Sequence, residues 1–212
     1  MPNDSRVKQK PKTKPGASVT SDRQSRVTAP TLLRDQAKEL GTILQDRLVS
    51  LIDLSLTLKH IHWNVVGPHF IAVHEMLDTQ YQEVLVLIDD LAERIATLGS
   101  SPSGLPGKIT RARSWDDYSL DRADALAHLG ALDIVYRSII NDHREAMARV
   151  EDIDRVSEDL LIGQTAVLER LHWYVRSHLA DFAGGMTNAG AMSELEAAEA
   201  VVAKSSRKLR TS

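Results

Sequence analysis

The chain has 212 residues, of which 42% are hydrophobic and 26% charged, the balance of a soluble chain that folds into one domain or at most two small ones. It has no cysteine, which excludes disulfides, zinc ribbons, iron–sulfur clusters and thiol nucleophiles. Aromatic residues make up only 4%, which favours packed helices over a β-sandwich. The sequence has neither a membrane-length apolar run nor a hydrophobic signal core, so we expect a cytoplasmic protein without membrane partners.

Charge is distributed unevenly along the chain. Residues 1–30 have seven basic and two acidic side chains, a net charge of +5, and residues 203–212 have four basic and no acidic ones, a net charge of +4. Since the whole chain has a formal charge of −3, residues 31–202 have a charge of −12. We therefore predict a basic, disordered N-terminal tail over 1–30, an acidic folded body over 31–185, and a flexible C-terminal tail with a basic end over 186–212.

The two basic tails have two interpretations. They are either solvating termini or arms that bind the phosphates of duplex DNA without reading its sequence. A single arm would bind weakly, whereas many arms on one particle would bind through avidity. On the second interpretation the DNA-binding residues are Lys8, Lys10, Lys12, Lys14, Arg23, Arg26, Lys204, Arg207, Lys208 and Arg210.

Apolar residues recur at helical spacing in four segments, about 31–65, 70–98, 120–150 and 153–183. The residues between the second and third segments are rich in Ser, Pro and Gly, which predicts a long connection with one short helix near Trp115. A connection of this length lets those two helices run parallel. The sequence thus predicts an all-α protein, a four-helix bundle with a long crossover between its second and third helices.

The second helical segment places His74, Asp78, Asp89 and Glu93 on one face, because their spacings of 4, 11 and 4 residues keep them within about 100°. Its apolar stripe points in a direction more than about 100° away and consists of Val73, Leu77, Val84, Ile88, Leu91 and Ile95. A metal site on the polar face would need a partner surface opposite it. Imidazole and carboxylate ligands suit Fe(II), Mn(II) or Zn(II). The alternative is a row of solvated acids with an incidental histidine.

Two further features leave alternatives open. His62 ends the apolar stripe of the first helix, as either an interior histidine or a ligand. Glu169 and His172 form a single Glu-x-x-His spacing, whereas an intrabundle dimetal site, as in a manganese catalase, uses two. We therefore interpret Glu169 and His172 as a surface pair. The acids of residues 151–159, with Asp142 and Glu145 nearby, either line an ion-entry pore or solvate a helix start.

Three segments resemble the signatures of the Dps family, the DNA-protecting mini-ferritins of starved bacteria: His62-Trp63-Asn64-Val65-Val66-Gly67, Val73-His74-Glu75-Met76-Leu77-Asp78 and Ile88-Asp89-Asp90-Leu91-Ala92-Glu93-Arg94. The similarity covers about residues 31–185. It implies a ferritin-like four-helix bundle, assembled as a dodecamer, with ferroxidase sites between subunits. In those sites His62 and His74 would come from one subunit and Asp89 and Glu93 from its neighbour. Asp78 would support the site or hold a second iron.

The resemblance also implies a function. Fe(II) would be oxidised by hydrogen peroxide, ferric mineral stored in the shell, and DNA protected in the nucleoid. Iron would be both substrate and stored product. Trp63 would either quench stray radicals or pack at an interface. The competing hypothesis is a mainly structural DNA-compacting protein with weak or vestigial ferroxidase activity.

Overall fold

A computed structural model describes residues 32–181 and 183–210 of the chain. Its helices are α1 (Arg34–Asn64), α2 (Phe70–Thr97), α3 (Pro106–Ala112), α4 (Ala125–Val150), α5 (Arg155–Leu179) and α6 (Glu194–Arg210). The only strands in these ranges are the two-residue β1 (Val65–Val66) and β2 (Ala123–Asp124). The prediction of an all-α four-helix bundle is confirmed. No helix in the described part is both long and apolar enough to cross a membrane.

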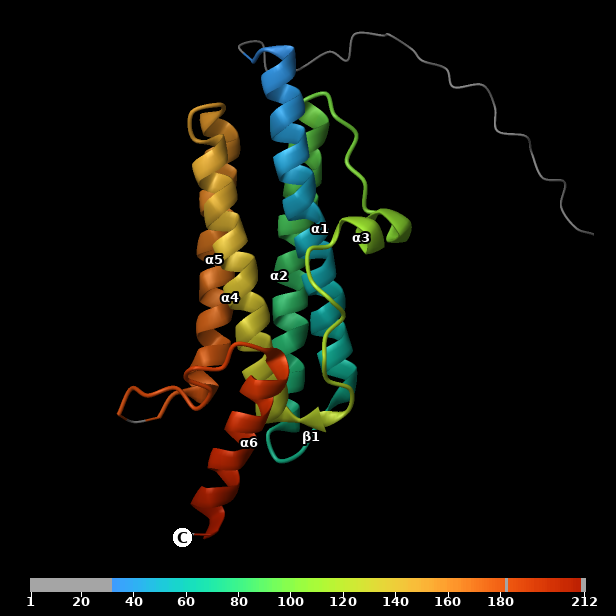
Figure 1. The fold of residues 1–212 in the computed structure, drawn as a ribbon. Helices are drawn as coiled ribbons and strands as arrows, with labels where there is room; N and C mark the ends of the chain where they lie inside the picture. Colours follow the sequence, from blue (N-terminus) through green and yellow to red (C-terminus); the bar gives the residue numbers. More distant parts are fainter. Residues whose placement is uncertain (1–31, 182, 211–212) are drawn as a thin grey trace, which may run out of the picture.

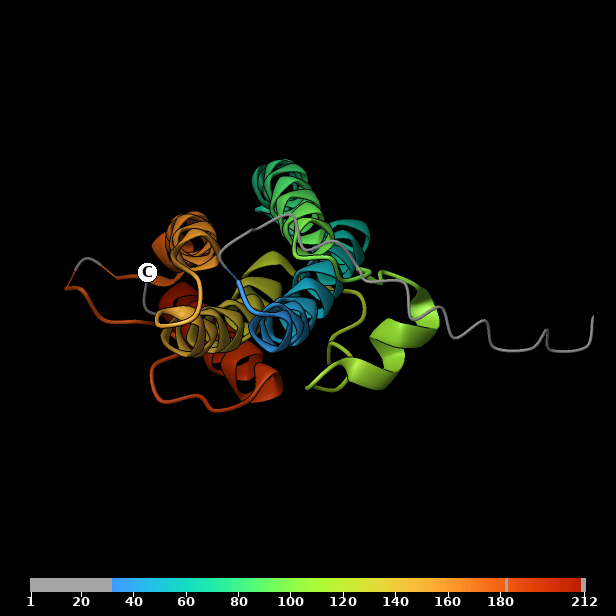
Figure 2. The same ribbon diagram turned by 90° about the horizontal axis from the view of Figure 1, so that it is seen from above.

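The long helices pack mainly as two pairs, α1 with α2 and α4 with α5, and α1 also contacts α4 (Figures 1 and 2). One continuous core fills the space between them. The apolar stripe predicted for the first helix is buried along its length, from Leu40 to Leu58. The sequence pattern also includes Leu33, but 70% of its surface is exposed because it precedes the first helical turn as the N-cap.

The end of α1 is joined to the start of α4 by a short parallel pairing, in which Val65 lies opposite Ala123 and Val66 opposite Asp124. The Asp124 carboxylate then caps α4 by accepting a 2.9 Å hydrogen bond from the backbone N–H of Leu126. The helix predicted to begin near residue 120 therefore begins five residues later. The turn after β1 uses Gly67 at a φ of 100°, a conformation that favours glycine.

The crossover between α2 and α4 contains the short helix predicted near Trp115, and this helix ends three residues before it. It begins at Pro106. At the first position of a helix the backbone N–H has no partner within the helix, so proline, which has no N–H, costs no hydrogen bond there. Trp115 instead fastens the connection to α1, since its indole Nε1 donates to the buried carboxylate of Asp53. Arg113 donates to the same carboxylate at 3.1 Å. The side chains of Trp115 and Arg113 thus hold the crossover against α1, because both donate to the carboxylate of Asp53.

The prediction of a flexible C-terminal tail is wrong for the residues of α6. This helix packs against α4 and extends past the end of the bundle (Figure 1). Its contact face is small and apolar, comprising Ala197, Ala198 and Val201. Gly130 of α4 allows the close approach, because a Cβ there would lie 2.8 Å from the Ala197 carbonyl oxygen. Small residues give a weak hydrophobic pattern, so the prediction of a tail rested on the basic composition at the end of this segment.

Candidate metal centre

Two histidines near the end of the bundle form a reciprocal pair across α1 and α2. The Nδ1 of His62 donates to the backbone carbonyl of His74 at 3.1 Å, and the Nδ1 of His74 donates to the carbonyl of His62 at 2.9 Å. The rings stack with their centroids 3.6 Å apart and their planes 20° apart. His62 is buried and His74 half-buried, with the ring of Phe70 packed 4.9 Å from that of His74.

These hydrogen bonds determine which nitrogen of each ring is available. A carbonyl oxygen only accepts, so each Nδ1 must be protonated, and in the neutral imidazole the Nε2 lone pair is then free. A histidine held through one nitrogen by a backbone carbonyl is the usual arrangement of a metal ligand. The pair therefore offers two oriented Nε2 lone pairs as ligands for a metal ion. Sequence reasoning left His62 open between core residue and ligand, and this geometry favours the ligand.

Asp78 lies beside this pair and is already engaged by a cation. Lys59 donates a 2.6 Å hydrogen bond to its Oδ1, and the Nδ1 of His62 lies 3.4 Å from the same atom. The hydrogen bond from Lys59 holds the pKa of Asp78 below its usual value, and the nearby histidines act in the same direction. Asp78 thus lies within reach of the candidate ligands but is paired with a lysine, which the helical spacing did not predict.

Asp89 and Glu93 lie on the same outward face of α2, but far from the histidines. Both are exposed, whereas the apolar stripe of α2 is buried apart from the partly buried Ile88, so the predicted separation of the two faces is confirmed. His74 and Asp89 are fifteen residues apart, which is about 22 Å along a helix. One protomer therefore does not bring the four predicted ligands together. Within the described ranges, no group of three or more His, Asp or Glu side chains could hold a metal ion.

The two helices that contain the predicted ligands also have exposed large apolar side chains. On α1 these are Leu56 and Trp63, and on α2 they are Ile71, Leu85 and Val86. Trp63 has 72% of its surface exposed although it directly follows His62. Several exposed large apolar side chains on two neighbouring helices are typical of an interaction site.

The Glu-x-x-His spacing of α5 does not form an intrabundle metal site. Glu169 is exposed and pairs with Arg144 of α4. His172 lies 2.7 Å from the carboxylate of Asp133, also on α4, which Asn188 contacts at 2.9 Å. Burial opposes ionisation of Asp133, but the hydrogen bonds from His172 and Asn188 outweigh it and lower its pKa. Glu169 is thus a surface residue, but the side chain of His172 is only 12% exposed, and each of the two pairs with α4 rather than with the other, so they do not form the predicted surface pair.

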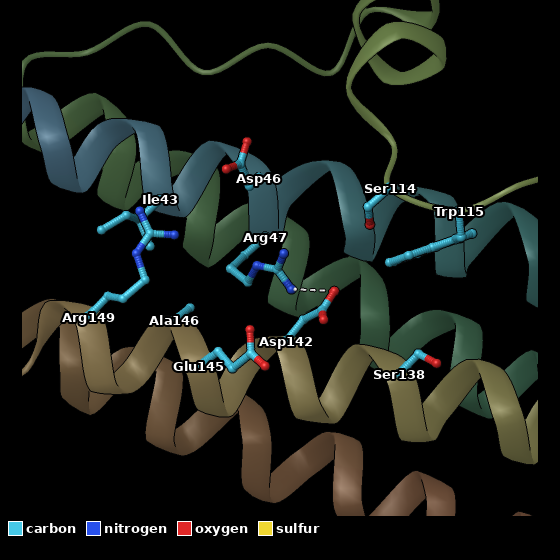
Figure 3. Close-up of a pocket in the computed structure, with 10 residues that line it drawn as sticks. All are labelled: Ile43, Asp46, Arg47, Ser114, Trp115, Ser138, Asp142, Glu145, Ala146 and Arg149. Carbon is cyan, nitrogen blue, oxygen red and sulfur yellow. Dashed lines mark ion pairs between the residues drawn. The ribbon is translucent and has the colours of Figure 1, made fainter.

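A separate hollow of about 470 Å³ lies between α1, α4 and the crossover (Figure 3). Three acids line it, Asp46, Asp142 and Glu145, together with Arg47 and Arg149. Arg47 pairs with Asp142 at 3.2 Å across the hollow. It contains none of the predicted metal ligands, so it is not the candidate metal centre.

The remaining predicted residues are the acids near the start of α5 and the basic residues of the two tails. Asp154 is the N-cap of α5: it accepts a 3.0 Å hydrogen bond from the backbone of Ser157 and pairs with Arg94 of α2. This supports the helix-start interpretation for that acid.

Among the predicted DNA-binding residues, Lys204 donates to the Met186 carbonyl at 3.2 Å. The backbone of Arg207, Lys208 and Arg210 belongs to α6. The predicted DNA-binding residues of the N-terminal tail lie outside the described residues: Lys8, Lys10, Lys12, Lys14, Arg23 and Arg26.

Comparison with known proteins identifies the family. The family described as ferritin-like domain matches residues 42–184. A "DNA protection during starvation protein" of Mycolicibacterium smegmatis is 49% identical over 178 residues, which cover 84% of this chain and 97% of that protein. The structure of Mycobacterium smegmatis Dps has a TM-score of 0.75 at 50% identity, over 77% of this chain and 93% of that one. The structure of DpsA14 from Streptomyces coelicolor also has a TM-score of 0.75, at 52% identity over 76% and 96% of the two chains. The chain is therefore a member of the Dps family of ferritin-like proteins.

Proposed function

We propose that this protein oxidises Fe(II) with hydrogen peroxide at sites shared between two subunits, and stores the ferric product inside a dodecameric shell. The observation that carries the proposal is the reciprocal His62–His74 pair, in which backbone carbonyls bind both Nδ1 atoms and leave both Nε2 atoms available as metal ligands. Neutral imidazoles combined with carboxylates form a donor set that suits Fe(II). Family membership supports the same chemistry.

The remaining ligands would come from a second subunit. An antiparallel copy of α2, aligned so that its Glu93 lies level with His74, places its Asp89 level with Asp78. Both pairs fit because they are centred on the same point of the helix, between Glu83 and Val84. A two-fold axis through that point creates two identical sites. The exposed apolar side chains of α1 and α2 would then be covered by the partner.

The shared site accounts for peroxide as the oxidant. Two Fe(II) ions each supply one electron, the O–O bond breaks, and two protons complete two molecules of water. Asp78 would help to hold the second iron ion once Lys59 no longer pairs with its carboxylate. Carboxylates are hard anionic ligands that stabilise Fe(III) more than Fe(II), so they favour the oxidised product. Delivering both electrons to one peroxide avoids free hydroxyl radical.

DNA protection would have a second component, nonspecific binding of duplex DNA by the basic tails. Twelve copies of a +5 arm on one particle would bind phosphates by avidity, with affinity that falls steeply with salt. Binding in the nucleoid would then place iron oxidation next to the DNA. The competing function, a DNA-compacting protein with vestigial ferroxidase activity, predicts the same DNA binding without rapid iron oxidation.

Mixed assemblies provide the decisive test of a shared site. One variant lacks the histidines (His62→Ala with His74→Ala) and the other lacks the acids (Asp89→Ala with Glu93→Ala). Each alone should lose rapid formation of ferric absorbance after anaerobic addition of Fe(II) and peroxide. When the two are unfolded together and refolded, each mixed pair has one intact site and one site without ligands, so activity should return.

A site contained within one subunit predicts no recovery, because neither chain has all of the ligands. Full activity in both separate variants would contradict the assigned ligands, whereas a wild-type protein without rapid ferric formation would favour the DNA-compacting function. Native mass measurements before and after mixing serve as the control for assembly.

A further inference from the structure

A second hollow, of about 480 Å³, lies where α4, α5 and the segment after α5 meet. The residues that line it include Arg137 of α4 and His172, Trp173 and Arg176 of α5. None of the predicted metal ligands lines it, and the function proposed above does not use it. Its volume lies within the range of pockets that hold small molecules.

Cationic side chains predominate in this hollow. Among the described residues that line it, the one acid is Glu169, which pairs with Arg144 from outside the hollow. Arg137 has no carboxylate partner within residues 32–181 and 183–210, and its Nη2 donates to the Ala191 carbonyl at 3.1 Å. A guanidinium group has five N–H donors, so this bond leaves most of them available. The hollow therefore offers positive charge to a ligand.

A buried carboxylate next to the hollow orients two of the lining side chains. One oxygen of Asp133 lies 2.7 Å from the Nε2 of His172 and 3.8 Å from the Nε of Arg176. Its other oxygen accepts a 2.9 Å hydrogen bond from Asn188, so both oxygens are held. With Nε2 engaged, the Nδ1 of His172 remains for a ligand. Arg176 approaches Asp133 through Nε, which leaves its two terminal nitrogens for an anion.

Trp173 adds a large aromatic surface beside these cations. It lines the hollow, and 62% of its surface is exposed although it lies within α5. The neighbouring ring of Tyr174 lies 5.2 Å away between centroids, with the planes tilted by 45°. Nucleobases stack on exposed aromatic rings, and guanidinium groups pair with phosphate oxygens. An exposed indole next to two arginines thus suits a ligand that has both a base and a phosphate.

The hollow of Figure 3 shows what distinguishes this one. It has almost the same volume, about 470 Å³, and is also lined by two arginines and a tryptophan. Three acids line it as well, and one of them pairs with Arg47. The indole nitrogen of its tryptophan, Trp115, is engaged with the carboxylate of Asp53. A phosphate there would meet like charge, so the two hollows form a matched contrast within one chain.

We propose that the hollow between α4 and α5 binds a nucleoside monophosphate. Arg137 and Arg176 hold the phosphate group, the base stacks on the indole of Trp173, and the Nδ1 of His172 supplies a further polar contact. A phosphate monoester has a charge of about −1.5 to −2 at neutral pH, which two guanidinium groups balance. A single exposed ring accommodates one base. The site binds its ligand without transforming it.

Calorimetric titration of the full-length, assembled and metal-free protein with AMP provides the test. Saturable binding of one AMP per subunit is expected, and adenosine and inorganic phosphate should each bind at least about tenfold more weakly. Arg137→Gln and Arg176→Gln should each weaken AMP binding severalfold. Trp173→Leu should weaken binding of AMP severalfold but leave that of inorganic phosphate unchanged. Arg149→Gln, in the hollow of Figure 3, is the matched control and should leave AMP binding unchanged.

Three results would overturn the proposal. The first is the absence of saturable AMP binding by the assembled protein, which is also expected if a second subunit covers the hollow. The second is equal AMP affinity in wild type, Arg137→Gln and Arg176→Gln, and the third is equal affinity for AMP and inorganic phosphate. Circular dichroism and native mass verify the fold and assembly of each variant. Iron oxidation enters none of these measurements, so this proposal and the ferroxidase function fail separately.

Discussion

Lys59 of α1 donates a 2.6 Å hydrogen bond to the carboxylate of Asp78 on α2, beside the paired histidines. Lys59 also lies 5.1 Å from the centre of the Tyr81 ring, which helps to hold the ammonium group in place. A cation thus occupies one of the carboxylates that the metal centre would use. Iron must compete with it.

Substituting Lys59→Met should strengthen metal binding at Asp78. Without the lysine, the pKa of Asp78 should rise toward its usual value, because the hydrogen bond from Lys59 is the main cause of its lowering. The carboxylate nevertheless stays ionised at neutral pH and is free to bind a metal. Calorimetric titration with Co(II) should show severalfold tighter binding of the second ion. Lys38→Met, at the exposed far end of α1, is the control and should leave both binding steps unchanged.

Acid should destabilise the bundle through its buried histidines. Burial lowers the pKa of both His128 and His143 to about 4, from 6.5 in an unfolded chain. The unfolded chain therefore binds more protons between these values, so the free energy of unfolding falls as the pH drops from 6.5 to about 4 and levels off below. Each histidine contributes about 3 kcal/mol to this loss.

The measurement is urea unfolding at a series of pH values. His143→Leu removes one of the two titrating groups and should flatten the pH dependence by roughly half. The exposed His69→Gln serves as the control and should leave the slope unchanged. An identical slope in wild type and His143→Leu would show that protonation of His143 does not lower the free energy of unfolding.

Gly130→Ala should release α6 from α4. The added Cβ would lie 2.8 Å from the Ala197 carbonyl and 3.0 Å from the Val201 side chain, which is too close without movement. We expect a cost of about 1–3 kcal/mol to helix docking. Limited proteolysis should then cut α6 while the bundle stays intact.

Gly163→Ala is the matched control for this substitution. Gly163 lies within α5 with no atom near its would-be Cβ, so alanine should stabilise the helix by roughly 0.5–1 kcal/mol. Equal protease sensitivity of α6 in the two variants would show that α6 tolerates a side chain at residue 130.

Deleting residues 1–30 should weaken DNA retention and its dependence on salt. The deletion removes seven cationic side chains from each subunit, and each phosphate contact contributes to the slope of log affinity against log salt concentration. Gel shifts at several salt concentrations provide the measurement. A Gly/Ser tail of equal length is the control for bulk. Unchanged retention would assign DNA binding to the C-terminal end or exclude the N-terminal tail from it.

Much of the fold could be predicted because long amphipathic helices encode their own faces. The stripe from Leu40 to Leu58 repeats every three or four residues, and burial of that face follows from hydrophobicity alone. The outward direction of Asp89 and Glu93 followed from the same periodicity. The C-terminal helix was missed because its contact with α4 depends on small residues meeting at Gly130. Close approach of two backbones leaves little hydrophobic signal in a sequence.

The amino-acid sequence by itself determined the four long helices, the crossover and the polar face of α2, since all of these are periodic along one segment. Only the tertiary structure decided how side chains from different segments meet. It paired His62 with His74 through their backbones, engaged Asp78 with Lys59, and joined Tyr118 to His128. Those contacts depend on the angle and register between helices. Helix packing sets these, and spacing within a single helix does not encode them.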